Sequence, residues 1–374
     1  MASQSQFRVL VVRLGAMGDI LHALPAVTAL RQAHPRWVID WVVEPRWRAL
    51  LSSEAGSGAR DPLTQPLVDH IHLAATKEWR KAPFSGRTLH EIRLLRRGLK
   101  DGRYDVSIDL QGALRSAVVS TFAGCRRRIG EMHPREQVAA WFFTDHVATQ
   151  GAHVIEQDVE LASAIAGDLL SPVQPLLPTD PRAEAWADDI LPPGGASAVL
   201  INPGAGWGAK RWPVERYAEI AKSLIADGFR ILVNAGPGEE PLAESILQGV
   251  GEGASAVTVL NCNLAHLIAA TRRVALVIAG DTGPLHLACA LGRPVVGIYG
   301  PTDPSRNGPF GGTFKVLRSP ESRRDHTRRA APEAGLLTIQ TADVLRAVHE
   351  LLYAGSASQS VHQTAAPGAS EIRP

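Results

Sequence analysis

One carboxylate stands where a parallel sheet places groups that act on ligands. Residues 7–12 form a short apolar run rich in β-branched side chains, which predicts a strand buried on both faces. The segment 13–19, RLGAMGD, follows this run, and its last residue, Asp19, opens a pattern of helical spacing. Ligands of open α/β sheets bind at such strand-to-helix turns. Asp19 therefore lies where a carboxylate can meet a ligand, although a simple helix cap is equally compatible with the pattern.

A second cluster lies in the other half of the chain, where residues 280–288 read GDTGPLHLA. A buried strand is predicted immediately before it, at 274–279. Pro284 suits the first turn of a helix, so the amides that follow Thr282 and Gly283 should point out of a helix N-terminus. Such a terminus binds phosphate through its free N–H groups and its dipole. The alternative is a capped helix without a ligand.

Two further loops follow predicted strands in this half. Residues 202–213, NPGAGWGAKRWP, are rich in glycine and carry Lys210 and Arg211, cations that could neutralise a leaving diphosphate. Residues 235–240, AGPGEE, offer Glu239 or Glu240 to ribose hydroxyls. A plain surface loop and the start of the next helix are the respective alternatives.

Cations gather in one segment of the first half, residues 77–84, KEWRKAPF. Lys77, Arg80 and Lys81 surround a tryptophan here, and an arginine offers a bidentate fork to phosphate or carboxylate. Because the segment shows no clear period, a solvated surface loop is the competing interpretation. Arg115 follows another predicted strand, 104–110, and should lie on the same rim of the sheet as Asp19.

The elements that must position these residues form two α/β halves. Strands are predicted at 38–43 and 68–73 in the first half, and at 198–202, 229–234, 256–260, 274–279 and 294–299 in the second. Helical runs separate the strands of the second half, as in right-handed crossovers. A proline-rich stretch lies between the halves. We therefore expect a domain at 1–175, a linker at 176–195, a second domain at 196–353 whose last helix packs back on the first, and a disordered tail at 354–374.

Composition limits the possible classes of protein. The 374 residues carry a formal net charge of +2, which is no nucleic-acid footprint. There is no apolar run long enough to span a membrane and no secretion signal at the N-terminus. Three cysteines without paired spacing predict reduced thiols in a cytoplasmic protein. We also find no sequence pattern typical of a metal site.

These residues together resemble glycosyltransferase family 9, the bacterial lipopolysaccharide heptosyltransferases, over most of residues 7–352. Within the family, the heptosyltransferase I branch is the most similar, although residues 204–213 look more like the heptosyltransferase II version. The resemblance is carried by residues 17–25, 40–44, 79–81, 108–112, 115–116, 281–283 with His286, and 299–304.

The resemblance implies a GT-B fold, with two Rossmann-like doubly wound domains facing a central cleft. It implies inverting, metal-independent transfer of L-glycero-D-manno-heptose from ADP-heptose to a Kdo residue of Kdo2-lipid A, without a cofactor. Asp19 would be the general base, and Lys210 would stabilise the departing diphosphate. The implied donor-binding residues are Glu239, Asp281, Thr282, Gly283 and His286, and the implied acceptor-binding residues are Lys77, Arg80, Lys81 and Arg115.

The same resemblance implies work at the cytoplasmic face of the inner membrane, by peripheral contact. The alternatives are heptosyltransferase II or another family 9 enzyme, a GT-B-type sugar-nucleotide epimerase, and a carbohydrate-binding protein without catalysis.

Overall fold

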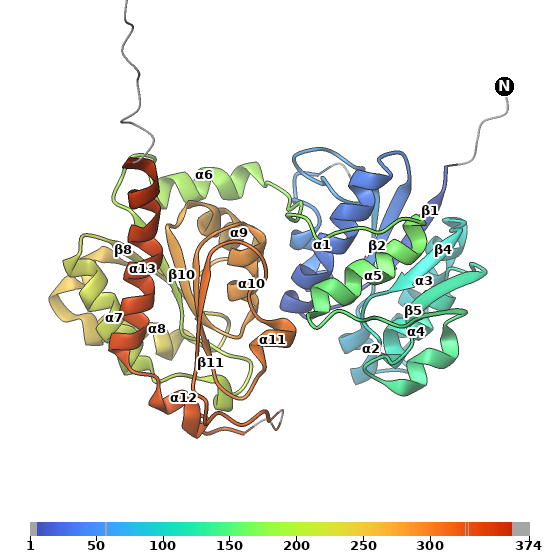
Figure 1. Ribbon diagram of the computed structural model, residues 1–374. Coiled ribbons are helices and arrows are strands. Elements are labelled where there is room, and N and C mark those ends of the chain that lie inside the picture. The colour runs from blue at the N-terminus through green and yellow to red at the C-terminus, as the bar shows by residue number, and fades with distance from the viewer. Residues whose placement is uncertain (1–5, 57, 326, 328, 361–374) are drawn as a thin grey trace, which may run out of the picture.

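Two separate parallel sheets form the core of the molecule (Figure 1). The structure, a computed structural model, describes residues 6–360 except 57, 326 and 328, without the side chains of 354–360. The first sheet contains β1 (Arg8–Val12), β2 (Val38–Val43), β3 (His70–Leu73), β4 (Val106–Asp109), β5 (Arg127–Glu131) and β6 (Asp145–Val147). The second contains β7 (Ala198–Asn202), β8 (Arg230–Asn234), β9 (Val257–Leu260), β10 (Leu276–Gly280), β11 (Val295–Tyr299) and β12 (Phe314–Arg318).

The two sheets share one strand order. The first runs β3-β2-β1-β4-β5-β6, and the second, read from its opposite edge, runs β9-β8-β7-β10-β11-β12. In each sheet the order reverses between the first and fourth strands, and ligands bind at such reversals. The loops after β1 and β4 carry Asp19 and Arg115, and those after β7 and β10 carry Lys210 and Asp281. The predicted GT-B fold is confirmed.

Helices cover both sheets. Those that pack on the first sheet are α1 (Met17–Ala33), α2 (Thr76–Lys81), α3 (Gly86–Asp101), α4 (Leu114–Thr121) and α5 (Val154–Ala166). The second half holds α6 (Pro181–Ile190), α7 (Val214–Ala226), α8 (Glu240–Val250), α9 (Leu264–Arg273), α10 (Gly283–Ala290), α11 (Pro304–Asn307), α12 (Ala334–Thr338) and α13 (Thr341–Ser360). Among the described residues, no helix has the length and apolar character needed to cross a bilayer.

α1 is one continuous helix although Pro25 lies inside it. Two expectations about helices need correction. The segment 77–84 begins with a short helix, α2, where a surface loop was one of two interpretations. The last helix extends to Ser360, and it packs on its own domain, because its apolar side chains Val344 and Val348 are buried in the core of the second sheet. The remainder of the predicted tail lies outside the described residues.

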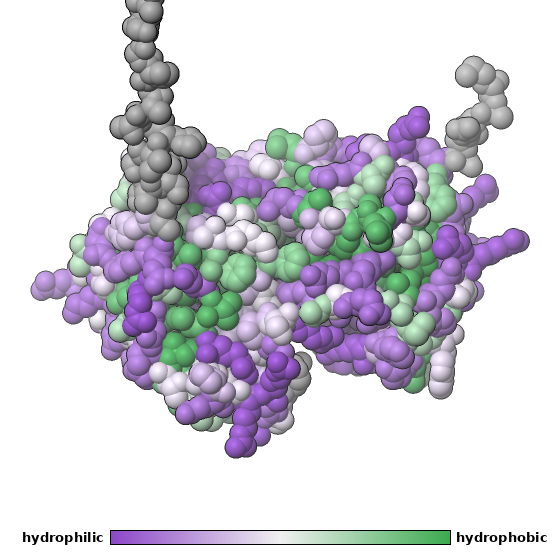
Figure 2. All heavy atoms as spheres, viewed as in Figure 1, coloured by the Kyte–Doolittle hydropathy of each residue, from purple (hydrophilic) through white to green (hydrophobic). Residues whose placement is uncertain are grey.

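The two domains meet along α1 and α10, which face each other in Figure 1. The space-filling view shows the halves in contact, with a notch between them at the lower edge (Figure 2). The contact is close because two glycines lie in it. A Cβ on Gly18 would lie 2.8 Å from His286 Cδ2, and a Cβ on Gly283 would lie 2.5 Å from Met17 Sδ. The N-termini of both helices therefore come together at the domain interface.

Candidate functional site

Asp19 occupies the first turn of α1, at the tip of the first domain's sheet. Its Oδ2 accepts a hydrogen bond from the Ala16 amide at 2.8 Å, and its Oδ1 lies 3.5 Å from the Arg13 guanidinium. The side chain is still 41% exposed. Asp19 thus caps its helix and also keeps part of its carboxylate accessible to a ligand, so the two interpretations of the sequence are compatible.

Behind Asp19 lie two buried carboxyl groups: Asp109, which ends the strand that precedes Arg115 and is expected on this rim, and Asp158, which sequence reasoning missed. Asp109 and Asp158 are both buried, and desolvation raises the pKa of Asp109 to about 6 and that of Asp158 to about 7. Asp109 Oδ1 accepts hydrogen bonds from the amides of Gln111 and Gly112, which form the turn after β4. The charge of Arg13 acts against the rise in both carboxyl groups. Asp158 leaves no sequence signal, because its helix position only becomes central once α5 packs on α1.

On the other side of the interface, Lys210 and Asp281 form an ion pair. Lys210 ends a short 3-10 turn after β7, and Asp281 directly follows β10. The ammonium group also lies 4.2 Å from the centre of the Trp207 ring. Burial alone would raise the pKa of Asp281, but the His286 hydrogen bond and the Lys210 charge hold it below its usual range. Asp281 is therefore ionised at neutral pH.

The start of α10 is the helix N-terminus that the sequence predicts after the strand at 274–279. Thr282 is the N-cap residue, and Gly283 and Pro284 open the first turn. The Thr282 hydroxyl lies 3.4 Å from Asn202 Nδ2, and Asn202 Oδ1 accepts a hydrogen bond from the side-chain Nδ2 of Asn234 at 2.6 Å. These hydrogen bonds connect the ends of β8, β7 and β10 and hold the loops that follow them together.

Glu239 and Glu240, which the sequence left open, are separated by the structure. Glu239 is half-buried at the start of α8 and accepts a hydrogen bond from the Gly236 amide at 3.0 Å. A Cβ on Gly204 would lie 2.1 Å from Glu239 Oε2, so this carboxylate reaches the glycine-rich loop after β7. Glu240 is exposed. The geometry favours Glu239 as the carboxylate of the donor site.

Three of the four predicted acceptor cations line one pocket. Lys77, Arg80 and Arg115 line a pocket of about 330 Å³ whose other lining residues include no carboxylate. Partial burial lowers the pKa of Lys77, and the charges of Arg46, Arg115 and Arg80 lower it further, against the opposing effect of Glu44. The neighbouring cations add a positive potential in this pocket, which an anionic ligand would relieve.

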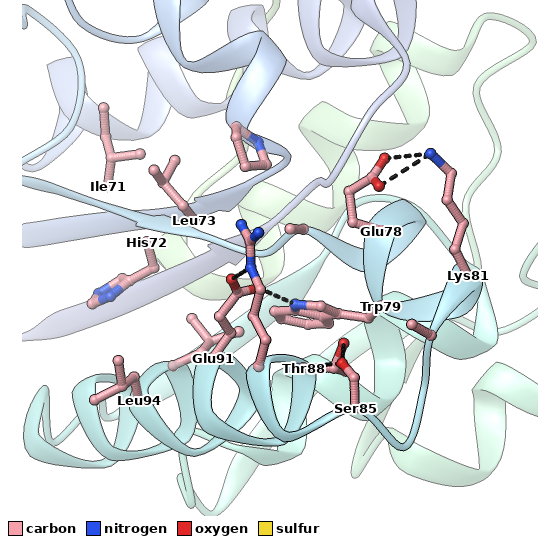
Figure 3. A pocket seen from close by; sticks show the side chains of 15 residues that line it. Ile71, His72, Leu73, Glu78, Trp79, Lys81, Ser85, Thr88, Glu91 and Leu94 are labelled. Carbon is pink, nitrogen blue, oxygen red and sulfur yellow. Dashed lines mark hydrogen bonds and ion pairs between the residues drawn. The ribbon is translucent and has the colours of Figure 1, made fainter.

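Lys81 lies elsewhere. It lines a neighbouring pocket of about 650 Å³, where its ammonium group lies 2.8 Å from Glu78 Oε1 (Figure 3). In the same pocket Glu91 accepts a hydrogen bond from Trp79 Nε1 at 2.8 Å and forms an ion pair with Arg87. Trp79 lines both pockets. It lies between a cationic pocket that no carboxylate of the described residues lines and one where Lys81 and Arg87 are paired with carboxylates.

The two domains are also joined by histidines. His22 Nε2 lies 3.1 Å from His286 Nδ1, and His286 Nε2 lies 3.3 Å from Asp281 Oδ1. The ring of His153 meets the His22 ring edge-on, with 5.5 Å between their centres. His22 lies within residues 17–25, which carry part of the family resemblance, but the sequence alone indicates no role for it.

Within the described part of the chain, no group of three or more His, Cys, Asp or Glu side chains is placed to hold a metal ion. The chemistry that this arrangement supports comes from a cleft carboxylate, a buried lysine, a helix N-terminus and a cationic pocket.

Comparison with known proteins agrees with this geometry. Residues 92–336 match the model of glycosyltransferase family 9 (heptosyltransferase). Lipopolysaccharide heptosyltransferase 1 of Escherichia coli K12 is 32% identical over 318 residues, which cover 84% of this chain and 94% of that protein. Lipopolysaccharide heptosyltransferase 1 of Pseudomonas aeruginosa is 30% identical, over 81% of each chain.

Solved structures give the same result. The E. coli heptosyltransferase WaaC with ADP superposes with a TM-score of 0.75 at 28% identity, over 92% of this chain and all of that chain. The same enzyme with ADP-2-deoxy-2-fluoro heptose gives a TM-score of 0.72 at 30% identity, over 92% and 99% of the two chains. The resemblance predicted from the sequence is confirmed, and the chain belongs to glycosyltransferase family 9 and is a glycosyltransferase.

Proposed function

We propose that this enzyme transfers L-glycero-D-manno-heptose from ADP-heptose to a Kdo residue of Kdo2-lipid A, in the synthesis of the lipopolysaccharide inner core. The observation that carries the proposal is the meeting of α1 and α10, which brings the Asp19 turn against the helix N-terminus beside Lys210. The solved relatives contain ADP and a fluorinated ADP-heptose, which supports a nucleotide-sugar donor.

The reaction follows from the charges on each side. The acceptor hydroxyl oxygen bonds to the anomeric carbon while the bond from that carbon to the diphosphate oxygen breaks. The hydroxyl proton passes to Asp19, and ADP leaves with the electron pair. Lys210 and the amides at the start of α10 stabilise the charge that develops on the diphosphate. One displacement inverts the anomeric centre, so a single carboxylate base is sufficient.

Donor and acceptor would be held by different domains. We assign Thr282 and Gly283 to the diphosphate of the donor, Asp281 to its sugar hydroxyls with His286 beside it, and Glu239 to the adenosine ribose. The acceptor is anionic, because Kdo carries a carboxylate and lipid A carries phosphates. Lys77, Arg80 and Arg115 line a pocket that offers cations and no competing carboxylate, which supports their part in acceptor binding.

The membrane surface is the second proposed partner, by peripheral contact at the cytoplasmic face of the inner membrane. Next to the acceptor pocket, Phe84 is 90% exposed and Leu94 is 56% exposed. The exposed Arg96 and Arg97 lie on the same helix as Leu94. Apolar and cationic side chains together suit an anionic lipid surface.

Transfer should disappear when Asp19 loses its charge. We would measure product from ADP-heptose and Kdo2-lipid A, with and without EDTA, for the wild type and Asp19→Asn. We expect metal-independent product with the wild type and a loss of about 100-fold or more in kcat with the variant, while ADP still binds. Full transfer by a folded Asp19→Asn would contradict the assignment of the base.

The capping role of Asp19 needs its own control. Glu156 holds the equivalent position in α5, where its Oε2 accepts from the His153 amide at 2.9 Å. Glu156→Gln should weaken that cap without loss of transfer.

Product only on an acceptor that already carries heptose would indicate heptosyltransferase II. Turnover of a nucleotide sugar without any acceptor would indicate an epimerase.

A further inference from the structure

A buried chain of hydrogen bonds crosses the domain interface and ends on the donor-site lysine. It runs from His22 on α1 to His286 on α10, then to Asp281 and Lys210. His22, His286 and Asp281 are at most 8% exposed, and the Lys210 side chain is 10% exposed. Its first member lies one turn after Asp19 on the same helix. The chain therefore connects the helix of the proposed base with the proposed diphosphate ligand.

The hydrogen atoms in this chain can be placed. Asp281 is ionised and only accepts, so His286 donates from Nε2. In the tautomer in which His286 Nε2 carries the hydrogen, Nδ1 carries a lone pair and accepts from His22 Nε2–H. Burial is the largest cause that lowers the pKa of His22 well below its usual value, so His22 is neutral and can carry one hydrogen on Nε2. Each bond thus fixes the tautomer of the next ring.

We propose that His22 is a positioning residue for the transfer reaction. Its Nε2–H orients the His286 ring and keeps that ring donating to Asp281. The positions of Asp281 and Lys210 relative to Asp19, on the other side of the interface, are thereby held. The inference rests on the proposed function, since it gives a role in that same site to a residue that touches neither substrate.

The interface also offers a neighbour that does not share this role. His153 packs against the His22 ring, and its Nε2 donates to the Gly308 carbonyl at 3.1 Å instead of joining the chain. Its Nδ1 caps α5 by accepting from the Ile155 amide. His153→Asn keeps a good N-cap residue and removes the interdomain bond. It is therefore a matched control for loss of a histidine at the interface.

The test compares His22→Leu, His22→Gln and His153→Asn. Gln can place an amide donor close to the position of Nε2, whereas Leu keeps the bulk and loses the donor. We expect His22→Leu to lower kcat about 10-fold or more with a much smaller change in the acceptor KM. His22→Gln should recover most of that loss, and His153→Asn should stay near the wild type at equal thermal stability. Equal activity of the Leu and Gln variants, or a fall matched by His153→Asn, would overturn the proposal.

A second measurement does not depend on transfer. Imidazole ¹⁵N spectra report the protonation of each nitrogen of His286, and ADP titration reports the donor site. In His22→Leu we expect the His286 Nδ1 signal to shift as its hydrogen bond is lost, together with weaker ADP binding. An unchanged His286 signal would refute the positioning role even if transfer occurs. If the wild type transfers no heptose to Kdo2-lipid A but His22→Leu still shows the shift and the weaker ADP binding, the proposed function fails while the positioning of His286 by His22 stands.

Discussion

The three carboxyl groups near Arg13 differ in their exposure and therefore in their pKa values. Asp19 faces the cleft, while Asp109 and Asp158 are buried behind it. Each of the two buried groups has one carboxyl oxygen without a hydrogen-bond partner among the described residues. A buried carboxylate with an unpaired oxygen is unfavourable when it is ionised, and this contributes to the raised pKa of both groups.

Asp158 should make the protein less stable as pH rises. The folded pKa is about 7, whereas an unfolded aspartate has a pKa of roughly 4, so the folded state binds more protons between these values. The contribution to stability is present at low pH and is lost as pH rises through this window. Desolvation dominates, and the charges of Asp19, Glu131 and Asp109 add to it against Arg13. We expect Asp158→Asn to gain about 2 kcal/mol relative to the wild type between pH 5 and pH 8.

Urea unfolding at both pH values measures this difference. The exposed Asp168 on the loop after α5 is the control, because Asp168→Asn should leave the difference between the two pH values unchanged. A pH-independent effect of Asp158→Asn would mean that the side chain acts through packing alone.

The cations of α2 should also differ in their effect. Arg80 lines the pocket without carboxylates, whereas Lys81 is already paired with Glu78. We expect Arg80→Ala to raise the acceptor KM about 10-fold or more, with little change in the KM for ADP-heptose. Lys81→Ala should have a much smaller effect, since an exposed pair contributes little. Steady-state kinetics with both substrates varied would show the contrast, and equal effects of the two variants would contradict the division of the pockets.

At the scale of elements, sequence reasoning found the strands that carry the site. Buried apolar runs identified β1, β2, β7, β10 and β11, because both faces of these strands are covered. It missed β5, β6 and β12, which are short, lie toward the sheet edges and contain charged or exposed residues such as those of 127–131, RRIGE. It also missed α5, whose position becomes important only through packing on α1.

The sequence was sufficient to predict which loops carry the site, but it did not predict which side chains in those loops pair with one another. The residues after each strand were identified, since the carboxyl ends of parallel strands share one edge. The pairing of Lys210 with Asp281 depends on β7 and β10 being neighbours, which periodicity does not reveal. Spacing on α2 also placed Lys81 with Lys77 and Arg80, yet Glu78, one turn before it, turns it away.

The contact between α1 and α10 makes a prediction about packing. Gly283→Ala should push its new methyl group into Met17, because the Sδ, Cγ and Cβ atoms of Met17 would all lie within 3.0 Å of it. We expect a loss of about 1–3 kcal/mol in the free energy of unfolding. The loss should be smaller in a Met17→Ala background, where the space is open. A double-mutant cycle by denaturant unfolding measures the coupling, and strict additivity would show that the helices do not meet in solution.

In the whole molecule, both sheets have the same strand order, and each reverses its order between its first and fourth strands. The helices that follow β1 and β10, α1 and α10, meet at the interface, so the proposed acceptor and donor sides lie next to each other. The connecting helix α6 packs on α9 of the second half, where Ala183, Ala187 and Ala269 form a small apolar cluster. The chain between the halves is therefore anchored to the second domain.

The ion pair between Lys210 and Asp281 also bears on what happens after the chemistry. A diphosphate that binds Lys210 competes with a carboxylate already in contact with it. If ADP is the product, as we propose, Asp281 can pair with Lys210 again when ADP leaves, and this pairing would favour release of the product. We therefore expect Asp281→Asn to lower the inhibition constant of ADP while it also lowers kcat, and product-inhibition kinetics would show both effects. The ion pair would then weaken product inhibition of the enzyme.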